Sequence, residues 1–469
     1  MSFTSFVFWL FFAGVLFFLG VVRDHLTRLI VLLLASLLFY GTGSLSHLAL
    51  LLGLGLTVFV LTRRMQRTSS RRRRKLLLFT CIAVNVGVLA LFKYSGFLVS
   101  IVNDVSRLVG SSLSISEAAL ALGLPLGISF FTFHNIAHSV DIENGQYRHE
   151  VGALEFFSGL FLFPKIVSGP ITRPHDILPQ LDEPSRLRWG AVQHGMLLVG
   201  LGLVKKTLAD MLAPVVIGAF DAVQPSTLEA WTGTLAFTAQ LYADFSGYTD
   251  IALGLGLLLG LKLPRNFNLP YISRSPVEFW SRWHITLSTW IRDYLYMPVA
   301  TSGRRPRPVL GLVVAMSLGG LWHGASWTFV VWGLYHGVLL AGSHGASALW
   351  RRGGASAGAV VRTGQVALTL YLVMVGFVLF RAPGIGAAGS LILAMHGVTS
   401  VPSLMTYEAT VMVALAGCAV VLPHVADHLA LRFEERPAHP LLHWGLVTAC
   451  VLATIITPTQ GATFIYANF

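Results

Sequence analysis

Apolar runs long enough to cross a membrane recur along the whole chain. A helix of about 17 to 25 apolar residues spans a hydrocarbon layer of about 30 Å. The clearest runs lie at 5–22, 28–41 joined to 46–62, 76–98, 190–204, 229–261, 308–322, 326–343, 364–381, 408–423 and 441–457. Several runs are short or merge with the next, so the pattern predicts an all-α, polytopic integral membrane protein with about ten to twelve crossings.

Composition supports the same class. Hydrophobic residues make up 54% of the 469 residues and charged residues 12%, with a mean hydropathy of +0.69. A water-soluble core of ordinary proportions cannot hide that much apolar surface. The cysteines Cys81, Cys418 and Cys450 stand singly, so neither a disulfide framework nor a zinc site is indicated.

The basic residues predict the orientation in the membrane. Arg23 and Arg28 flank the first short loop, the loop at 41–46 is uncharged, and 63–75 holds eight Lys and Arg without an acid. The positive-inside rule then places 23–28 and 63–75 in the cytoplasm and the N-terminus outside.

The first run has no basic n-region and no small-residue cleavage site, so we expect a retained helix. The arginines suit anionic lipid, and without interleaved aromatic residues they indicate no nucleic-acid partner.

Glycine and proline interrupt two apolar stretches, at 119–133 and 161–174. Loosened backbone is tolerated at membrane depth only where it lines a cavity or is buried in protein. The breaks at 123–127 and 169–170 therefore predict a water-accessible or substrate-filled interior that they line or support.

The stretch EFWSRWHITLSTWIRDYLYMP (278–298) reads as one amphipathic helix that is too polar to span. Its apolar stripe at helical spacing consists of Trp280, Trp283, Leu287, Trp290, Ile291 and Tyr294. Tryptophans beside arginines favour a helix that lies at the interface or dips into it. His284 follows Trp280 by four residues, so we expect its ring to turn from the edge of the stripe toward the protein interior. The alternative is a capped interfacial histidine.

His323 lies within GGLWHGASWTFVVWGLYHG (319–337), an apolar stretch with a second histidine, His336. An ionisable ring at membrane depth is costly, and its default interpretation is functional. The alternative is a ring that hydrogen-bonds a backbone carbonyl in a packed bundle. For His336 we expect a packing or hydrogen-bonding role.

Two carboxylates precede these motifs. Asp244 and Asp250 open an apolar run, and a polar break with Asn266 and Asn268 follows it. The carboxylates can bind a cation, neutralise an arginine or order a histidine, and an ordering or structural role is favoured.

Together these motifs resemble the membrane-bound O-acyltransferase family, and within it the bacterial alginate O-acetyltransferase membrane-subunit type. The resemblance rests on DFSGYTDIALGLGLLLG, RNFNLPYISRSPVEFWSRWHITLSTWIRDYLYMP and LWHGASWTFVVWGLYHG, and upstream on KYSGF, LPLGISFFTFHNIAHSVDI and LFPKIVSGPITR. It covers about residues 90 to 345. It implies one membrane domain, 1–469, whose helices ring a central tunnel, with interfacial and re-entrant helices. Residues 1–98 would be N-terminal helices, 99–350 the catalytic core and 351–469 C-terminal helices.

The resemblance also implies the site. His323 would be the principal catalytic residue and His284 the second polar residue of the tunnel, with no metal. We expect the substrate tunnel to include Asp244, Trp283, Trp322 and Asn266. Acyl transfer from a thioester to a hydroxyl needs a base, and imidazole titrates near working pH. Burial favours the neutral ring, which can accept the proton. His284 can hold the donor carbonyl, orient His323 or bind the acceptor.

The expected substrates and partners follow from the family. The donor would be acyl-CoA, with acetyl-CoA favoured, or an acyl carrier, and no cofactor would be bound. The acceptor would be a hydroxyl of an extracytoplasmic polysaccharide such as alginate, reached directly or through a periplasmic esterase-like partner at the bacterial inner membrane. The sequence departs from the family at His134 and His138, and at VATSGRRPRP after Pro298, which leaves the acceptor and the partner contacts open.

Three other functions compete with this one. HNIAH (134–138) and HVADH (424–428) have the HxxxH spacing of a di-iron enzyme, but such sites need about eight histidines with an HxxHH box, and the chain has no such box. A lipid or polysaccharide transporter would explain a cavity but not the Trp-rich helix with LWHG. D-alanyl transfer toward teichoic acid would use the same chemistry on another acceptor.

The arginine runs generate a topology prediction. A reporter fused after residue 70 should be cytoplasmic, and one fused at residue 44 should be external, because only the first of these loops is basic. Paired alkaline phosphatase and fluorescent protein fusions measure the two sides. Both reporters on one side would contradict the assigned orientation.

Overall fold

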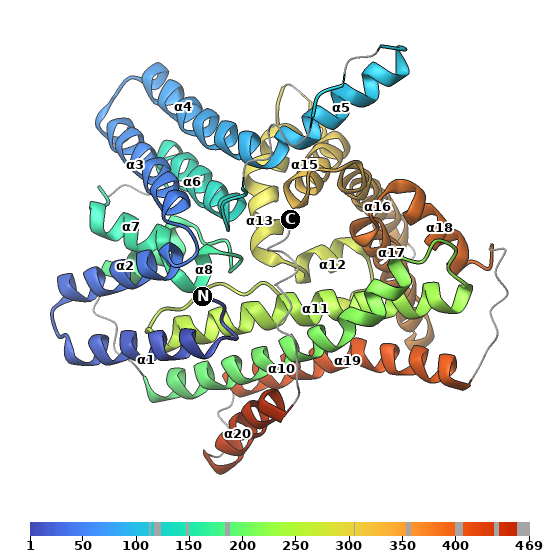
Figure 1. The fold of residues 1–469 in the computed structure, drawn as a ribbon. Helices are drawn as coiled ribbons and strands as arrows, with labels where there is room; N and C mark the ends of the chain where they lie inside the picture. The colour runs from blue at the N-terminus through green and yellow to red at the C-terminus, as the bar shows by residue number, and fades with distance from the viewer. Residues whose placement is uncertain are drawn as a thin grey trace. The chain divides into compact units, whose positions relative to one another are not determined.

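In the computed structural model, the described residues are 1–111, 114–116, 123–146, 150–182, 188–303, 305–352, 358–398, 407–435 and 440–456. They form helices and no strand (Figure 1), which confirms the all-α prediction. Residues 119–122 of the first predicted break and 353–357 of a Gly/Ala-rich stretch lie outside the described residues.

Contacts divide the chain into two compact units. The first comprises Met1–Gly195 with Ala252–Pro264, and the second comprises Met196–Ile251 with Arg265–Phe469. The first unit holds α1 (Phe6–Val21), α2 (His25–Gly41), α3 (Leu45–Arg67), α4 (Arg71–Leu89), the π-helix η1 (Ala90–Tyr94), α5 (Ser95–Leu108), α6 (Ile128–Glu143), α7 (Ala153–Phe161), α8 (Phe163–Ile166) and α9 (Pro174–Asp182). Both α10 (Trp189–Phe220) and α11 (Thr227–Leu258) contribute residues to each unit.

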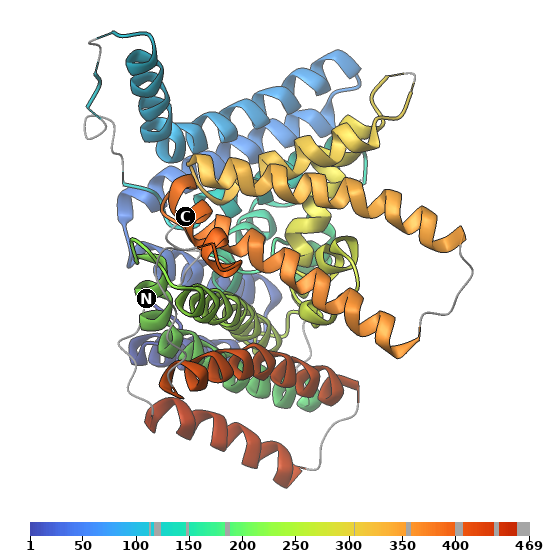
Figure 2. The ribbon, with the colours of Figure 1, turned by 90° about the vertical axis from the view of Figure 1, so that its right-hand side faces the viewer.

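The second unit contains the remaining elements. They are the 3-10 helix η3 (Pro270–Ile272), α12 (Pro276–Arg282), α13 (Ile285–Ile291), the π-helix η4 (Arg292–Tyr296), α14 (Met297–Ala300), α15 (Pro308–His323), α16 (Trp327–Arg352), α17 (Ala359–Arg381), α18 (Ile385–Met395), α19 (Tyr407–Glu435) and α20 (Pro440–Ile456). Figure 2 shows α16 and α17 lying side by side.

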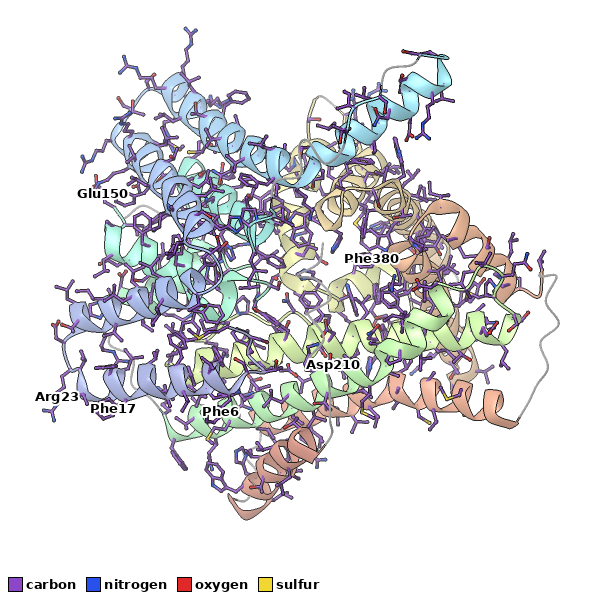
Figure 3. The ribbon with its side chains drawn as sticks, in the orientation of Figure 1. Phe6, Phe17, Arg23, Glu150, Asp210 and Phe380 are labelled. Carbon is purple, nitrogen blue, oxygen red and sulfur yellow. The ribbon has the colours of Figure 1, made fainter. Side chains whose placement is uncertain are left out.

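Four helical segments among the described residues are long and apolar enough to cross a membrane. They are Leu45–Arg67, Arg71–Leu108, Ala359–Arg381 and Ala414–Glu434. Shorter apolar helices span Phe6–Val21, His25–Gly41, Pro308–His323, Ile385–Met395 and Leu442–Thr454. On α1, Phe6 and Phe17 are 75% and 67% exposed and project from the helix (Figure 3). Such an apolar outer surface suits a lipid environment.

The basic segment 63–75 forms the end of α3 and the start of α4. Although this segment contains no acid, the fold brings one to it, because Arg63 and Arg67 both bind Glu150, at 3.3 and 3.0 Å. Hydrogen bonds from Arg67 lower the pKa of the exposed Glu150 carboxyl below its ordinary value. Arg74 hydrogen-bonds the backbone oxygens of Ile142 and Glu143. The remaining basic residues of the segment are exposed, which suits contact with anionic lipid.

Helix α6 is absent from the predicted apolar runs, yet it is almost entirely buried. It carries His134, Asn135 and Asp141 on its buried surface. These polar residues interrupt its apolar pattern, so hydrophobicity alone does not predict it. It begins after Gly127, whose φ of +73° favours glycine and whose Cβ would lie 2.5 Å from the backbone oxygen of Ile166.

The second predicted break lies against the same segment. A Cβ on Gly169 would lie 2.4 Å from the Cα of Lys165. The backbone therefore turns closely on itself around α8, so the breaks at 123–127 and 169–170 support each other within the first unit.

The single amphipathic helix predicted over 278–298 is wrong. The chain forms α12, leaves the helical conformation at Trp283 and His284, and resumes as α13, η4 and α14. His284 has φ +42°, in the left-handed region. A regular 3.6-residue stripe could not reveal this break, because its cause lies about 18 residues upstream, at Asn266.

Glycines set the packing of α15 against α16. A Cβ on Gly333 would lie 2.4 Å from the backbone oxygen of Met316, and one on Gly320 would lie 2.2 Å from that of Phe329. The two backbones thus touch directly beside His323, the last residue of α15. No side chain can be inserted there without separating the helices.

We expect Gly333→Ala to lower the stability of the protein by about 1–3 kcal/mol, because the added methyl overpacks a backbone contact. Gly342→Ala is the matched control on the same helix, since a Cβ there meets nothing within 4 Å. Apparent thermal unfolding midpoints of the two variants in detergent make the comparison. Equal midpoints would contradict the backbone contact.

Candidate active site

His284 lies between α12 and α13, where the side chain of Asn266 holds it. The oxygen Oδ1 of Asn266 accepts hydrogen bonds from the backbone N–H of Thr286 at 3.3 Å and from its hydroxyl at 2.6 Å. The Nδ1 atom of His284 lies 3.2 Å from the same oxygen. Because the Thr286 N–H requires an acceptor, the amide oxygen must face this way, and Nδ1 of His284 must donate. The neutral ring then carries its lone pair on Nε2.

Backbone hydrogen bonds fix the same loop. The N–H of Ile285 donates to the backbone oxygen of Asn266 at 2.9 Å, and that of Asn268 donates to Arg282 at 3.0 Å. The polar break upstream therefore runs alongside the gap between the two helices. Left-handed backbone at a non-glycine residue costs about 1–2 kcal/mol, and such strain clusters at functional sites.

His323 lies at the end of α15 in an aromatic surround. Its ring centroid is 4.9 Å from that of Trp322, 5.1 Å from Trp332 and 5.2 Å from Phe380, all edge to face. The residue is 3% exposed. It therefore occupies a dry site, in which a hydrogen bond or a developing charge is stronger than in water.

Trp322 connects the two histidines. Its ring lies 6.3 Å from that of His284 and next to that of His323. Phe245 packs against the other side of the site, with its ring 4.6 Å from that of His284. Both imidazoles are buried, as we expected for His284, and they share a neighbour.

His336 has the packing and hydrogen-bonding role expected from the sequence. Its Nδ1 accepts a hydrogen bond from the indole N–H of Trp280 at 3.3 Å, and its ring packs 4.8 Å from that of Trp332. Gly376 leaves room for it, because a Cβ there would lie 2.5 Å from Nε2. The ring thereby supports Trp332, which contacts His323.

The other residues expected to line a tunnel have different surroundings. Trp283 stacks on Phe279 and Tyr271, with ring centroids 5.5 and 6.0 Å away, inside an aromatic cluster. The carboxylate of Asp244 lies 2.9 Å from the ammonium of Lys206. This contact fits the structural role favoured for Asp244, although the partner is a lysine and not the expected arginine or histidine.

A second buried ion pair lies nearby on the same helices. Lys205 of α10 binds Asp250 of α11 at 2.6 Å and also binds Asp427 of α19, which accepts a hydrogen bond from Tyr242. Neither lysine was predicted as a site residue. The signal was available, because two adjacent lysines interrupt the apolar run of α10.

The family model described as MBOAT, membrane-bound O-acyltransferase family, matches residues 32–380. The chain belongs to the membrane-bound O-acyltransferase family. It is therefore a multi-pass membrane acyltransferase, and the match extends on both sides of the segment that carried the sequence resemblance.

Three relatives of this membrane-bound O-acyltransferase are named for different acyl-transfer reactions. It is 36% identical to the probable alginate O-acetylase AlgI of Azotobacter vinelandii, over 78% of this chain and 72% of the relative. It is 35% identical to the peptidoglycan O-acetyltransferase of Helicobacter pylori, over 66% and 63%. It is 30% identical to the teichoic acid D-alanyltransferase of Streptococcus thermophilus, over 46% and 55%.

The first histidine of each HxxxH pair of this acyltransferase accepts a backbone hydrogen bond. His134 accepts a hydrogen bond from the N–H of Thr172 at 3.1 Å, and His424 accepts one from the N–H of Tyr271 at 3.1 Å. Across the described ranges, no group of three or more His, Cys, Asp or Glu residues is arranged to hold a metal ion. Each first histidine thus clamps a loop.

We expect Asn266→Leu to reduce acyl transfer by about 10²-fold, because a misplacement of His284 by about 1 Å is enough for such a loss. Asn268→Leu is the matched control, since its side chain is exposed and only its backbone holds the loop. Acylated product in membranes at equal expression is the measurement. Equal losses in both variants would contradict the role of the Asn266 side chain.

Proposed function

We propose that the protein transfers an acyl group, with acetyl favoured, from a cytoplasmic thioester to a hydroxyl of an extracytoplasmic polysaccharide. The donor is acyl-CoA, the membrane is the bacterial inner membrane, and the N-terminus lies outside. Two relatives named for O-acetyl transfer, to alginate and to peptidoglycan, support acetyl as the group and a polysaccharide as the acceptor. D-alanyl transfer is less well supported, because the relative with that name matches only 46% of this chain.

The observation that carries the proposal is the pair of buried imidazoles that both lie beside Trp322. Acyl transfer needs a base that is neutral before the reaction and a dry surround that strengthens its contacts. His323 has that surround, with three aromatic rings within about 5 Å. In the proposed step its imidazole takes the proton of the acceptor hydroxyl, and the hydroxyl oxygen attacks the thioester carbonyl. The carbon–sulfur bond then breaks, and the leaving thiolate takes the proton back from His323.

His284 acts as the second polar group. Its Nδ1–H is committed to Asn266, so the neutral ring presents an acceptor at Nε2. An acceptor atom cannot hold the donor's carbonyl oxygen, which needs a hydrogen-bond donor. Of the three roles open to it, orienting His323 or binding the acceptor hydroxyl therefore suits His284 better.

The acyl group reaches its acceptor either directly or through a periplasmic, esterase-like partner protein. We favour direct transfer through a tunnel that passes His323, with Asp244, Trp283, Trp322 and Asn266 along it. A relay would need a second hydroxyl on the partner but the same base, so the role of His323 is common to both routes.

We expect His323→Ala to abolish acyl transfer while the protein still inserts and folds. General-base catalysis typically contributes about 10² to 10⁴ in rate, so loss of the base leaves activity near background. His284→Ala should cause a large but partial loss, because water can replace a positioning group in part. Acylated product in membranes at matched expression measures both, and His344→Ala, an exposed position on α16, is the control.

Two outcomes would contradict this assignment. Near wild-type acylation in His323→Ala would remove it as the base, and retained function without acylation would favour a transporter. Loss of activity together with loss of detergent stability would show that His323 serves packing.

A further inference from the structure

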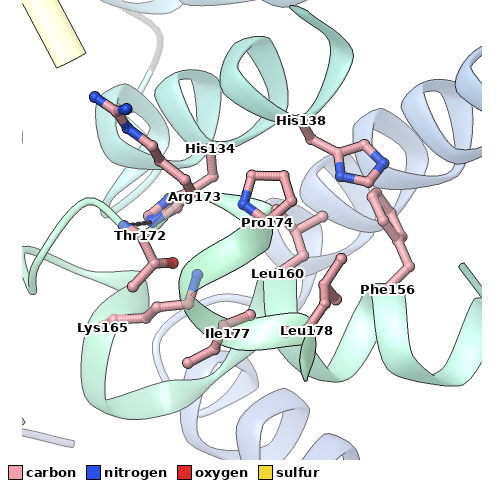
Figure 4. A pocket seen from close by; sticks show the side chains of 11 residues that line it. His134, His138, Phe156, Leu160, Lys165, Thr172, Arg173, Pro174, Ile177 and Leu178 are labelled. Carbon is pink, nitrogen blue, oxygen red and sulfur yellow. Dashed lines mark hydrogen bonds between the residues drawn. The ribbon is translucent and has the colours of Figure 1, made fainter. Parts of the chain in front are cut away.

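A pocket in the first unit contains a buried lysine that forms no ion pair with a described residue. The pocket opens to solvent and has a cavity volume of about 30 Å³. Figure 4 shows Lys165 with its side chain directed toward Thr172, among residues of α6, α7 and α9. Lys165 is only 1% exposed.

The ammonium of Lys165 has no hydrogen bond or ion pair with any residue in the described part of the chain. Asp176 acts on it through space, but no carboxylate oxygen of the described residues lies within the 4.0 Å of an ion pair. Asp176 instead accepts a hydrogen bond from the backbone N–H of Arg173 at 2.7 Å. A buried charge without a partner is strongly destabilising, whereas the other buried lysines described above, Lys205 and Lys206, each bind two aspartates.

Two further donors line the pocket. The hydroxyl of Thr172 is buried and makes no hydrogen bond to another described residue. The imidazole of His138 is held edge to face against Phe156, with centroids 4.8 Å apart, and uses neither nitrogen in a bond within the described chain. An ammonium, a hydroxyl and an imidazole thus line one pocket. Donors of these kinds complement an oxyanion.

The backbone around these donors is fixed. His134 accepts the hydrogen bond from the N–H of Thr172, and Gly169 lets the loop turn back onto Lys165. The donors are thus positioned before any ligand arrives, which reduces the entropic cost of binding.

We propose that this pocket binds an oxyanion, the phosphate or carboxylate group of a small molecule or of a longer substrate, through Lys165, Thr172 and His138. Leu160, Ile177 and Leu178 form its apolar wall. The small cavity admits one charged group but not several linked ones. The site requires no acyl transfer, and its test is independent of the proposed function.

The test measures binding directly. The detergent-solubilised protein is heated in sodium phosphate, sodium acetate or sodium chloride of equal ionic strength. We expect the apparent unfolding midpoint of the wild type to rise by about 2 °C or more in phosphate or acetate relative to chloride, because an ion that binds only the folded state stabilises it. A larger rise in phosphate identifies the bound group as a phosphate, as on acyl-CoA. A larger rise in acetate identifies it as a carboxylate, as on a uronate sugar.

The variants separate a site from a general salt effect. Lys165→Met should abolish the rise and Lys165→Arg should keep part of it, while Lys262→Met, at an exposed lysine of the same unit, should keep all of it. Thr172→Val, which retains the charge and the volume, should raise the half-saturating concentration about tenfold. The proposal is overturned if the wild type shows equal midpoints in all three salts. It is equally overturned if Lys165→Met or Thr172→Val responds as the wild type does.

Discussion

One amide oxygen holds the centre of the second unit in place. Oδ1 of Asn266 accepts hydrogen bonds from the N–H and hydroxyl of Thr286 and from His284. Each such bond contributes about 1 kcal/mol, which offsets the cost of a left-handed residue of about 1–2 kcal/mol. These bonds hold the chain out of the helical conformation between α12 and α13, where the ring of His284 is buried. The conformation, tautomer and burial of His284 all depend on this contact.

Buried charges impose a second constraint on the same unit. Lys205 and Lys206 sit in apolar helices, where an unpaired ammonium is not tolerated, so α10 can pack only where aspartates meet it. Asp427 supplies one of these contacts from α19, far along the chain. Apolar packing alone tolerates sliding between helices, whereas these pairs select one register. The polar residues near the site thus specify how the helices are arranged, and the aromatic residues fill the space between those helices.

The sequence predicted the features of the structure that depend on residues close together in the chain. Apolar runs predicted most helices, and the LWHG and RWH motifs pointed to His323 and His284, whose rings both lie beside that of Trp322. The helix break at His284 escaped because it depends on Asn266, and the role of Lys205 escaped because its partners are 45 and 222 residues away. Helix α6 escaped because its buried face is polar. For the helix break and for Lys205 the deciding partner is remote in sequence, and periodicity carries no information about it.

The contact of α15 with α16 at Gly320 and Gly333 also limits how the site can move. Side chains at a helix crossing can change rotamer and let two helices slide, but two touching backbones have no such freedom. A shift of one residue would bring a side chain into the crossing. The two helices therefore cannot slide past each other and must move as one rigid body. Of the rings around His323, that of Phe380 belongs to α17, outside this pair of helices, so its rotamer can change without separating α15 from α16.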